Sequence, residues 1–139
     1  MTVQVGWDKG EWTIIRVRFE GEWVWDDLAS GLEEVDALLI SVDHRVDLII
    51  DATGSQMIPN DLLQHIREIA TPAGRENEGA KVVVGANGVV RAGYGLFRRM
   101  YGRQIKDRGL LFAGTLEEAY EIIAEARADS RQRHEGEEL

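Results

Sequence analysis

The sequence predicts a single α/β domain, because segments with two different apolar periodicities alternate along its 139 residues. Short β-branched runs are typical of strands, and longer segments whose apolar residues recur every three or four positions are typical of helices. The resulting order is β-β-α-β-α-β-α-β-α. Alternation of this kind predicts a mixed, mostly parallel sheet packed with helices, within the size range of one domain.

An antiparallel hairpin is expected at the start of the chain. Residues 3–7 form a short apolar run, and Asp8-Lys9-Gly10 is typical of a tight turn in which Gly10 supplies the positive φ. Over 12–19, apolar residues alternate with Arg16 and Arg18, as expected of a strand with one buried face.

The remaining elements follow from the same two patterns. Helices are expected over 26–42, 59–70, 90–101 and 115–126, and strands over 46–51, 81–85 and 110–113. Thr115 and Glu118 have the spacing of a capping box at the start of the last helix. We therefore place the domain at residues 1–127 and expect 128–139, which contains few apolar residues, to be a disordered acidic tail.

Composition narrows the range of functions. The chain has no cysteine, which excludes disulfides and thiolate chemistry, and its net charge of −9 argues against binding nucleic acid. The charge is uneven: residues 20–51 hold ten acids and one arginine, whereas 88–108 hold six bases and one acid. Solvated helix faces explain this uneven distribution. Oppositely charged poles through which the protein associates with a copy of itself, or binds an anion at the basic end, would explain it too. We find neither a signal peptide nor an apolar run long enough for stable membrane insertion, so we expect a cytoplasmic protein.

Four segments carry a family resemblance. They are residues 19–28 (FEGEWVWDDL), 46–51 (VDLIID), 81–85 (KVVVG) and 115–119 (TLEEA). In their order, the chain resembles STAS domains, named for sulfate transporters and anti-sigma-factor antagonists, over about residues 3–127. It is most similar to the stand-alone SpoIIAA-like proteins, which have no settled biochemical activity and look related to lipid-carrying CRAL-TRIO domains.

The resemblance implies a fold but not the regulatory switch of the antagonist domains. Those domains carry a phosphorylatable serine at the start of the helix that follows the central strand. Here the corresponding region reads Ile58-Pro59-Asn60-Asp61, with no hydroxyl side chain. Thr53 and Ser55 precede it and would substitute only if the loop were rearranged.

A ligand site is expected at the carboxyl ends of the parallel strands, where crevices form in open α/β sheets. Two segments meet this condition: Thr53, Gly54 and Ser55 after one strand, and Asn87 and Gly88 after the next, with Arg91 one helical turn further. Exposed N–H groups there would hold an anion. The simpler interpretation of the second segment is a tight strand-to-helix turn, since it lacks the spacing of a nucleotide-binding loop.

Two carboxylates, Asp47 and Asp51, share one strand face. They could do acid–base work, but an acid at the end of a strand commonly ties the next loop through its N–H groups, and we favour that structural role. The histidines His44, His65 and His134 are scattered, so no metal site or cofactor is expected.

Tryptophans gather in the first 25 residues and suggest an interaction surface. Trp23 and Trp25 precede the acidic pair Asp26 and Asp27 at the strand-to-helix corner. They either pack inside that corner or form an exposed aromatic anchor for a partner.

Together these features predict a non-catalytic binding or regulatory module, because we find no nucleophile–base pair and no metal cluster. The expected partner is another protein or a second copy in a homodimer. The alternative is a carrier or sensor of a small anionic or lipid-like ligand at the strand ends.

Overall fold

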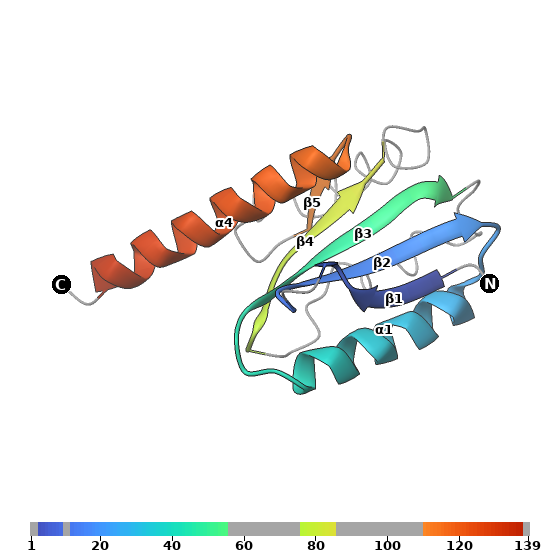
Figure 1. Cartoon of the computed structure of the whole chain (residues 1–139), viewed down its shortest axis with the longest axis horizontal. Helices are drawn as coiled ribbons and strands as arrows, with labels where there is room; N and C mark the ends of the chain where they lie inside the picture. The colour runs from blue at the N-terminus through green and yellow to red at the C-terminus, as the bar shows by residue number, and fades with distance from the viewer. Residues whose placement is uncertain (1–2, 10–11, 56–75, 86–109, 138–139) are drawn as a thin grey trace.

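The computed structural model describes residues 3–9, 12–55, 76–85 and 110–137 (Figure 1). In that part of the chain it contains five strands and two helices. They are β1 (Val3–Trp7), β2 (Ile14–Gly21), α1 (Trp25–Ile40), β3 (Val46–Ser55), β4 (Glu78–Val84), β5 (Leu110–Ala113) and α4 (Leu116–Glu137). The helices expected over 59–70 and 90–101 lie outside the described residues.

The strands form one mixed sheet in the order β1-β2-β3-β4-β5. Strand β1 runs antiparallel to β2, and each of the other neighbouring pairs is parallel. The expected α/β class, the opening hairpin and the mostly parallel sheet are thereby confirmed. Figure 1 shows α1 running alongside β1 and α4 running alongside β5, at opposite sides of the molecule.

Helix α1 and the inward face of the hairpin build the first core. Ile15, Val17 and Phe19 alternate along β2 and are buried, as the sequence pattern predicted. The helix supplies side chains at three- and four-residue steps, and Leu48 of β3 completes the layer; the buried helical residues are Leu28, Val35 and Leu39. Gly31 allows the helix to approach β1 closely, since a Cβ there would lie 2.9 Å from Val3 Cγ1.

Helix α4 covers the opposite face of the sheet. Ile49 of β3, Val82 and Val84 of β4, and Ala113 of β5 pack against its Ala119 and Ile123, which are buried. A side-chain hydrogen bond starts this helix as expected: Thr115 Oγ1 accepts from the Glu118 N–H at 3.1 Å. The Glu118 carboxylate accepts from Gly114 N–H.

Strand β3 is longer than predicted. The expected strand ended at Asp51, but pairing with β2 resumes after a register shift between Arg18 and Glu20 and continues to Ser55. The chain needs a glycine in this extension, because a Cβ on Gly54 would lie 2.9 Å from the Phe19 carbonyl oxygen. Three of the expected ligand-site residues are therefore strand residues.

The expectation of a disordered tail over 128–139 was wrong for most of that segment, because α4 continues to Glu137. Alanine, arginine, glutamine and glutamate predominate in it, and their high helix propensity supports a helix without apolar periodicity. Figure 1 shows the last turns of α4 projecting beyond the sheet. Neither described helix is both long enough and apolar enough to cross a bilayer.

Candidate functional site

The structure places half of the expected ligand site. Thr53 and Gly54 are exposed near the carboxyl end of β3, and the backbone of Ser55 ends that strand. Asn87, Gly88 and Arg91 lie outside the described residues, so the proximity expected between the two segments stays a prediction.

Asp51 is the hydrogen-bond acceptor for both polar groups of Thr53. The Asp51 carboxylate accepts one hydrogen bond from the Thr53 N–H at 3.1 Å and another from its hydroxyl. This matches the structural role we favoured for an acid at a strand end. Both donors of Thr53 are therefore engaged by a carboxylate that would itself repel an anion.

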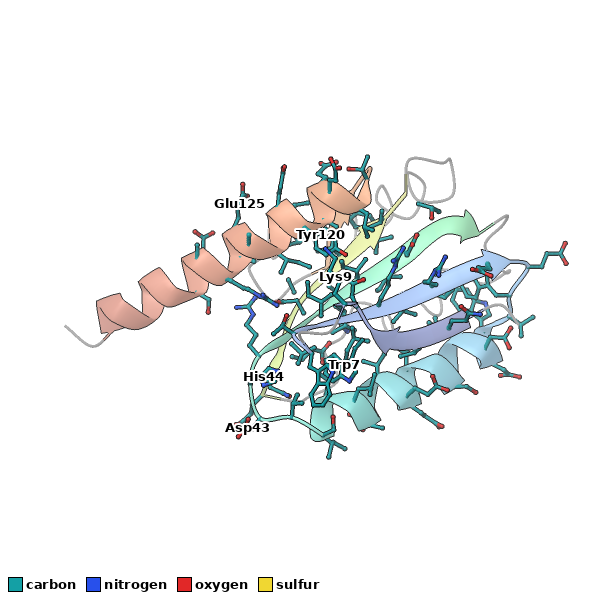
Figure 2. All side chains as sticks on the ribbon, viewed as in Figure 1. Trp7, Lys9, Asp43, His44, Tyr120 and Glu125 are labelled. Atoms are coloured by element: carbon teal, nitrogen blue, oxygen red, sulfur yellow. The ribbon has the colours of Figure 1, made fainter. Side chains whose placement is uncertain are left out.

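Arg16 lies between two carboxylates, an arrangement that the sequence did not reveal. Its Nη2 is 2.6 Å from Asp51 Oδ2, and its Nη1 is 3.8 Å from Asp8 Oδ1. On the other side, Asp8 accepts a hydrogen bond from the hydroxyl of Tyr120 on α4. Lys9 lies 4.4 Å from the centroid of the Tyr120 ring, which Figure 2 shows beside it.

This network perturbs three ionisable groups. The hydrogen bond to Asp51 raises the pKa of Arg16. Burial raises the pKa of the Asp51 carboxyl, but hydrogen bonds from Thr53 and Arg16 outweigh it and leave that pKa below the ordinary value. Burial, together with the hydrogen bond to Asp8, raises the pKa of Tyr120 to about 12. Near neutral pH, Arg16 and Asp51 are therefore charged and Tyr120 is protonated.

Asp47, the second acid on this strand face, is fully buried and lies within a separate cluster. Its Oδ1 accepts from Arg45 and from the Ala80 N–H at 2.8 Å, and its Oδ2 lies 2.6 Å from Nε of Arg127. Each oxygen of the carboxylate is thus held by donors from other parts of the chain. Buried charges of this kind are retained when they are paired and hydrogen-bonded.

The tryptophan corner is packed rather than open. Trp23 is 9% exposed, its ring stacks on Phe19 with 4.6 Å between centroids, and Trp25 meets it edge-on at 5.1 Å. Of the two alternatives, packing inside the corner therefore holds for Trp23, because its ring belongs to the core between β2 and α1 and is not exposed as an anchor. Trp25 is half-buried.

The two acids that follow this corner differ in their surroundings. The Asp27 carboxylate accepts a hydrogen bond from the Val24 N–H at 3.0 Å. At this position the positive end of the helix dipole also stabilises the negative carboxylate. Asp26 is exposed. Of the expected interaction surface, Asp26 is thus exposed, whereas Asp27 is half-buried.

Large apolar side chains are exposed elsewhere on this side of the molecule. Among the described residues these are Trp12, Val24 and Ile40, which are 57%, 56% and 61% exposed. Trp12 stacks on Trp7 with ring centroids 6.3 Å apart, and His44 lies 2.7 Å from its carbonyl oxygen. No pattern in the sequence distinguished Trp12 from its buried neighbours.

Trp12 and Ile40 lie at the same end of the molecule. Ile40 is the last residue of α1, and His44, which contacts Trp12, lies in the segment that joins α1 to β3. Figure 2 shows Trp7 and His44 at this end. We call this pair of exposed side chains, Trp12 and Ile40, the apolar end.

Helix α1 adds strong negative charge to this side. Its sequence holds five acids and no base: Asp26, Asp27, Glu33, Glu34 and Asp36. Asp26, Glu33 and Glu34 are exposed, so the outer surface of the helix is acidic. A surface with this charge favours a basic partner.

Within the described residues, no group of three or more histidine, aspartate or glutamate side chains is arranged to hold a metal ion. The chain matches no protein-family model, no curated protein and no solved structure at the significance level that we required.

Proposed function

We propose that this chain is a non-catalytic module that binds another protein through the side of the molecule formed by α1 and the β1–β2 hairpin. The observation that carries the proposal is the position of the exposed apolar side chains. All three in the described part of the chain belong to α1, to the residue that precedes it, or to the hairpin turn. Exposed tryptophan is typical of the anchor residues of protein interfaces.

The charges of α1 support the same side. An acidic surface beside an apolar end provides both an anchor and a means of selecting a partner by charge. The complementary poles considered from the sequence would suit a second copy, but the basic segment over 88–108 lies outside the described residues. We therefore propose a partner protein, with a homodimer as the alternative that the experiment distinguishes.

The polar networks favour binding over chemistry. Asp51 accepts from both Arg16 and Thr53, and Asp47 is enclosed by arginines, so these groups stabilise the sheet in the role we propose for them. The same contacts weigh against a small anionic ligand at the end of β3, because the donors of Thr53 are taken and Asp51 is negative. We also propose a STAS-like architecture, for which the sequence resemblance is the only support.

The experiment compares two surface variants of the full chain in affinity capture from the native host with quantitative mass spectrometry. Trp12→Ala combined with Ile40→Ser removes the apolar end, whereas Glu125→Ala changes an exposed residue of α4. We expect a partner recovered in stoichiometric amount with the wild-type protein and with Glu125→Ala, and at least tenfold less with the double variant.

Light scattering on the purified chain measures self-association in parallel. A stable dimer that the double variant dissociates would assign this surface to a second copy. Equal recovery of every captured protein by the wild type and the double variant, together with a monomer by light scattering, would contradict the proposed function.

A further inference from the structure

Among the strands that the structure describes, β1 lies at one edge of the sheet, and its own sequence lacks the usual protection. Edge strands commonly carry a charged residue, a proline or a bulge, which prevents pairing with another chain. Strand β1 reads VQVGW, with no charge and no proline, and its five pairs with β2 run without a register shift. Figure 1 shows it as the outermost strand on this side.

The backbone groups that face outward on β1 can be identified. The N–H of Asp8 donates to the Ile14 carbonyl at 2.8 Å, so Asp8 and Ile14 form a hydrogen-bonded pair. Because such pairs alternate along an antiparallel ladder, Gly6 and Gln4 also bond to β2. The N–H and C=O groups of Val3, Val5 and Trp7 therefore point away from the sheet.

The acidic flank of α1 lies next to this edge. Gly31 contacts β1, since a Cβ there would lie 2.9 Å from Val3 and 3.4 Å from Val5. Around the helix, the buried Leu28 and Val35 lie on one side of Gly31, toward the core, and Asp27 and Glu34 lie on the other.

We propose that β1, at the edge of the described sheet, accepts an extended, basic segment of a partner protein as an added antiparallel or parallel strand. The proposal rests on the protein-binding function above and names the kind of partner. Backbone hydrogen bonds from Val3, Val5 and Trp7 supply affinity in such strand addition, and side-chain contacts supply specificity. Every second side chain of the added strand would meet the flank formed by Asp27 and Glu34, which favours lysine or arginine there.

The opposite face of the edge leaves room for the side chains in between. A Cβ on Gly6 would have no atom within 4 Å, so the space above it is open. A large side chain of the added strand can cover an edge glycine of this kind. On the α1 face of the same edge, Trp12 of the following turn is exposed and stacks on Trp7, so an apolar ring lies at the end of this edge.

Charge also decides between a partner and a second copy. If two copies paired their β1 edges about a two-fold axis, the acidic flanks of the two α1 helices would lie close together, beside the new strand pairing. Like charges opposed across an interface are unfavourable. A basic segment removes this repulsion, which is why the proposal commits to a partner chain.

The test uses a fluorescent peptide of alternating lysine and valine, with an alternating glutamate and valine peptide as its charge control. Fluorescence anisotropy measures binding to the full chain at low ionic strength. Amide hydrogen exchange by NMR then locates it: we expect the lysine peptide to bind and to slow exchange at Val3, Val5 and Trp7 at least tenfold. Equal binding of both peptides, or protection of other amides only, would overturn the proposal.

Two pairs of variants sharpen this test. Glu34→Lys is expected to weaken binding of the lysine peptide about three- to tenfold, whereas Glu33→Lys, the same charge change away from the edge, changes it less than twofold. Val5→Pro removes an outward N–H, a position at which an edge strand tolerates proline. It should abolish binding, whereas Val5→Thr, which keeps that N–H, should retain it.

The outcomes separate this proposal from the proposed function. A cellular partner that is lost with the Trp12 and Ile40 double variant but retained by Val5→Pro and Glu34→Lys would overturn the edge site and leave the binding function standing. A dimer whose formation protects the β1 amides would also overturn it, by assigning the edge to a second copy.

Discussion

Arg127 of helix α4 holds the fully buried carboxylate of Asp47 on strand β3, with 2.6 Å between Nε and Oδ2. The same guanidinium donates to the Thr13 carbonyl at 2.9 Å, just before β2 begins. Asp47 in turn accepts from the Ala80 N–H of β4. This ion pair and its hydrogen bonds thus join the last helix to β3, to β4 and to the residue that precedes β2.

Replacing Asp47 by alanine should therefore be strongly destabilising. The change leaves Arg45, Arg127 and the Ala80 N–H without their shared acceptor. Removing one partner of a buried ion pair typically costs about 3–5 kcal/mol. Urea unfolding measures this loss, and Asp43→Ala, at an exposed acid nearby, should change the free energy of unfolding by less than about 0.5 kcal/mol. Equal effects of the two substitutions would contradict the importance assigned to this ion pair.

Local patterns predicted much of the fold but little of these networks. The alternation of Ile15 and Val17 and the helical spacing of Leu28 and Val35 each reflect burial within one element, so a single segment reveals them. The hydrogen bond between Tyr120 and Asp8 spans 112 positions, and nothing near either residue indicates the other. Such pairs depend on the tertiary arrangement of the elements.

The candidate interaction surface shows the same limit. The cluster of tryptophans indicated an aromatic feature near the hairpin, but which ring is exposed depends on the tertiary fold. Trp23 fills the space beneath Phe19, whereas Trp12 lies at the turn with its ring against Trp7. The edge position of β1 likewise follows from strand order, which sequence periodicity does not determine.

Thr53 should control the ionisation of Asp51. Its hydroxyl and N–H donate to a carboxylate that burial alone would make harder to ionise, and the net pKa lies below the ordinary 3.8. Thr53→Val removes the hydroxyl at similar volume, so we expect the pKa of Asp51 to rise. NMR titration of the side-chain carboxyl carbon measures it. Ser41→Ala, which removes a hydroxyl remote from Asp51, should leave that pKa unchanged.

The same group makes stability depend on acid pH. Because the pKa of Asp51 is lower in the folded chain than in the unfolded chain, the unfolded state binds more protons below about pH 5. The free energy of unfolding should therefore fall as the pH drops toward and through the folded pKa. In Thr53→Val this decrease should be smaller. An identical decrease at acid pH in the wild type and the variant would contradict the assigned role of the hydroxyl.

Tyr120 should make stability depend on alkaline pH in the opposite sense. Burial and the hydrogen bond to Asp8 raise the pKa of its hydroxyl to about 12, above the ordinary value of 10. The stabilisation is complete below pH 10 and is lost as the pH rises toward 12, because the unfolded state releases its proton first. The difference between the tyrosinate absorbance titrations of the wild type and Tyr120→Phe reports this pKa. A difference curve centred at pH 10 would contradict the prediction.

The backbone at Trp12 should favour glycine over alanine, because its φ of 56° lies in the left-handed region, which is costly for other residues. Trp12→Gly and Trp12→Ala both lose the ring that stacks on Trp7, so their difference isolates the backbone conformation. We expect the glycine variant to be more stable in urea by about 0.5–1 kcal/mol. At Gln4, an exposed residue inside β1, the order should reverse, because glycine weakens an extended strand. The same order at both positions would show that the turn does not impose the left-handed conformation in solution.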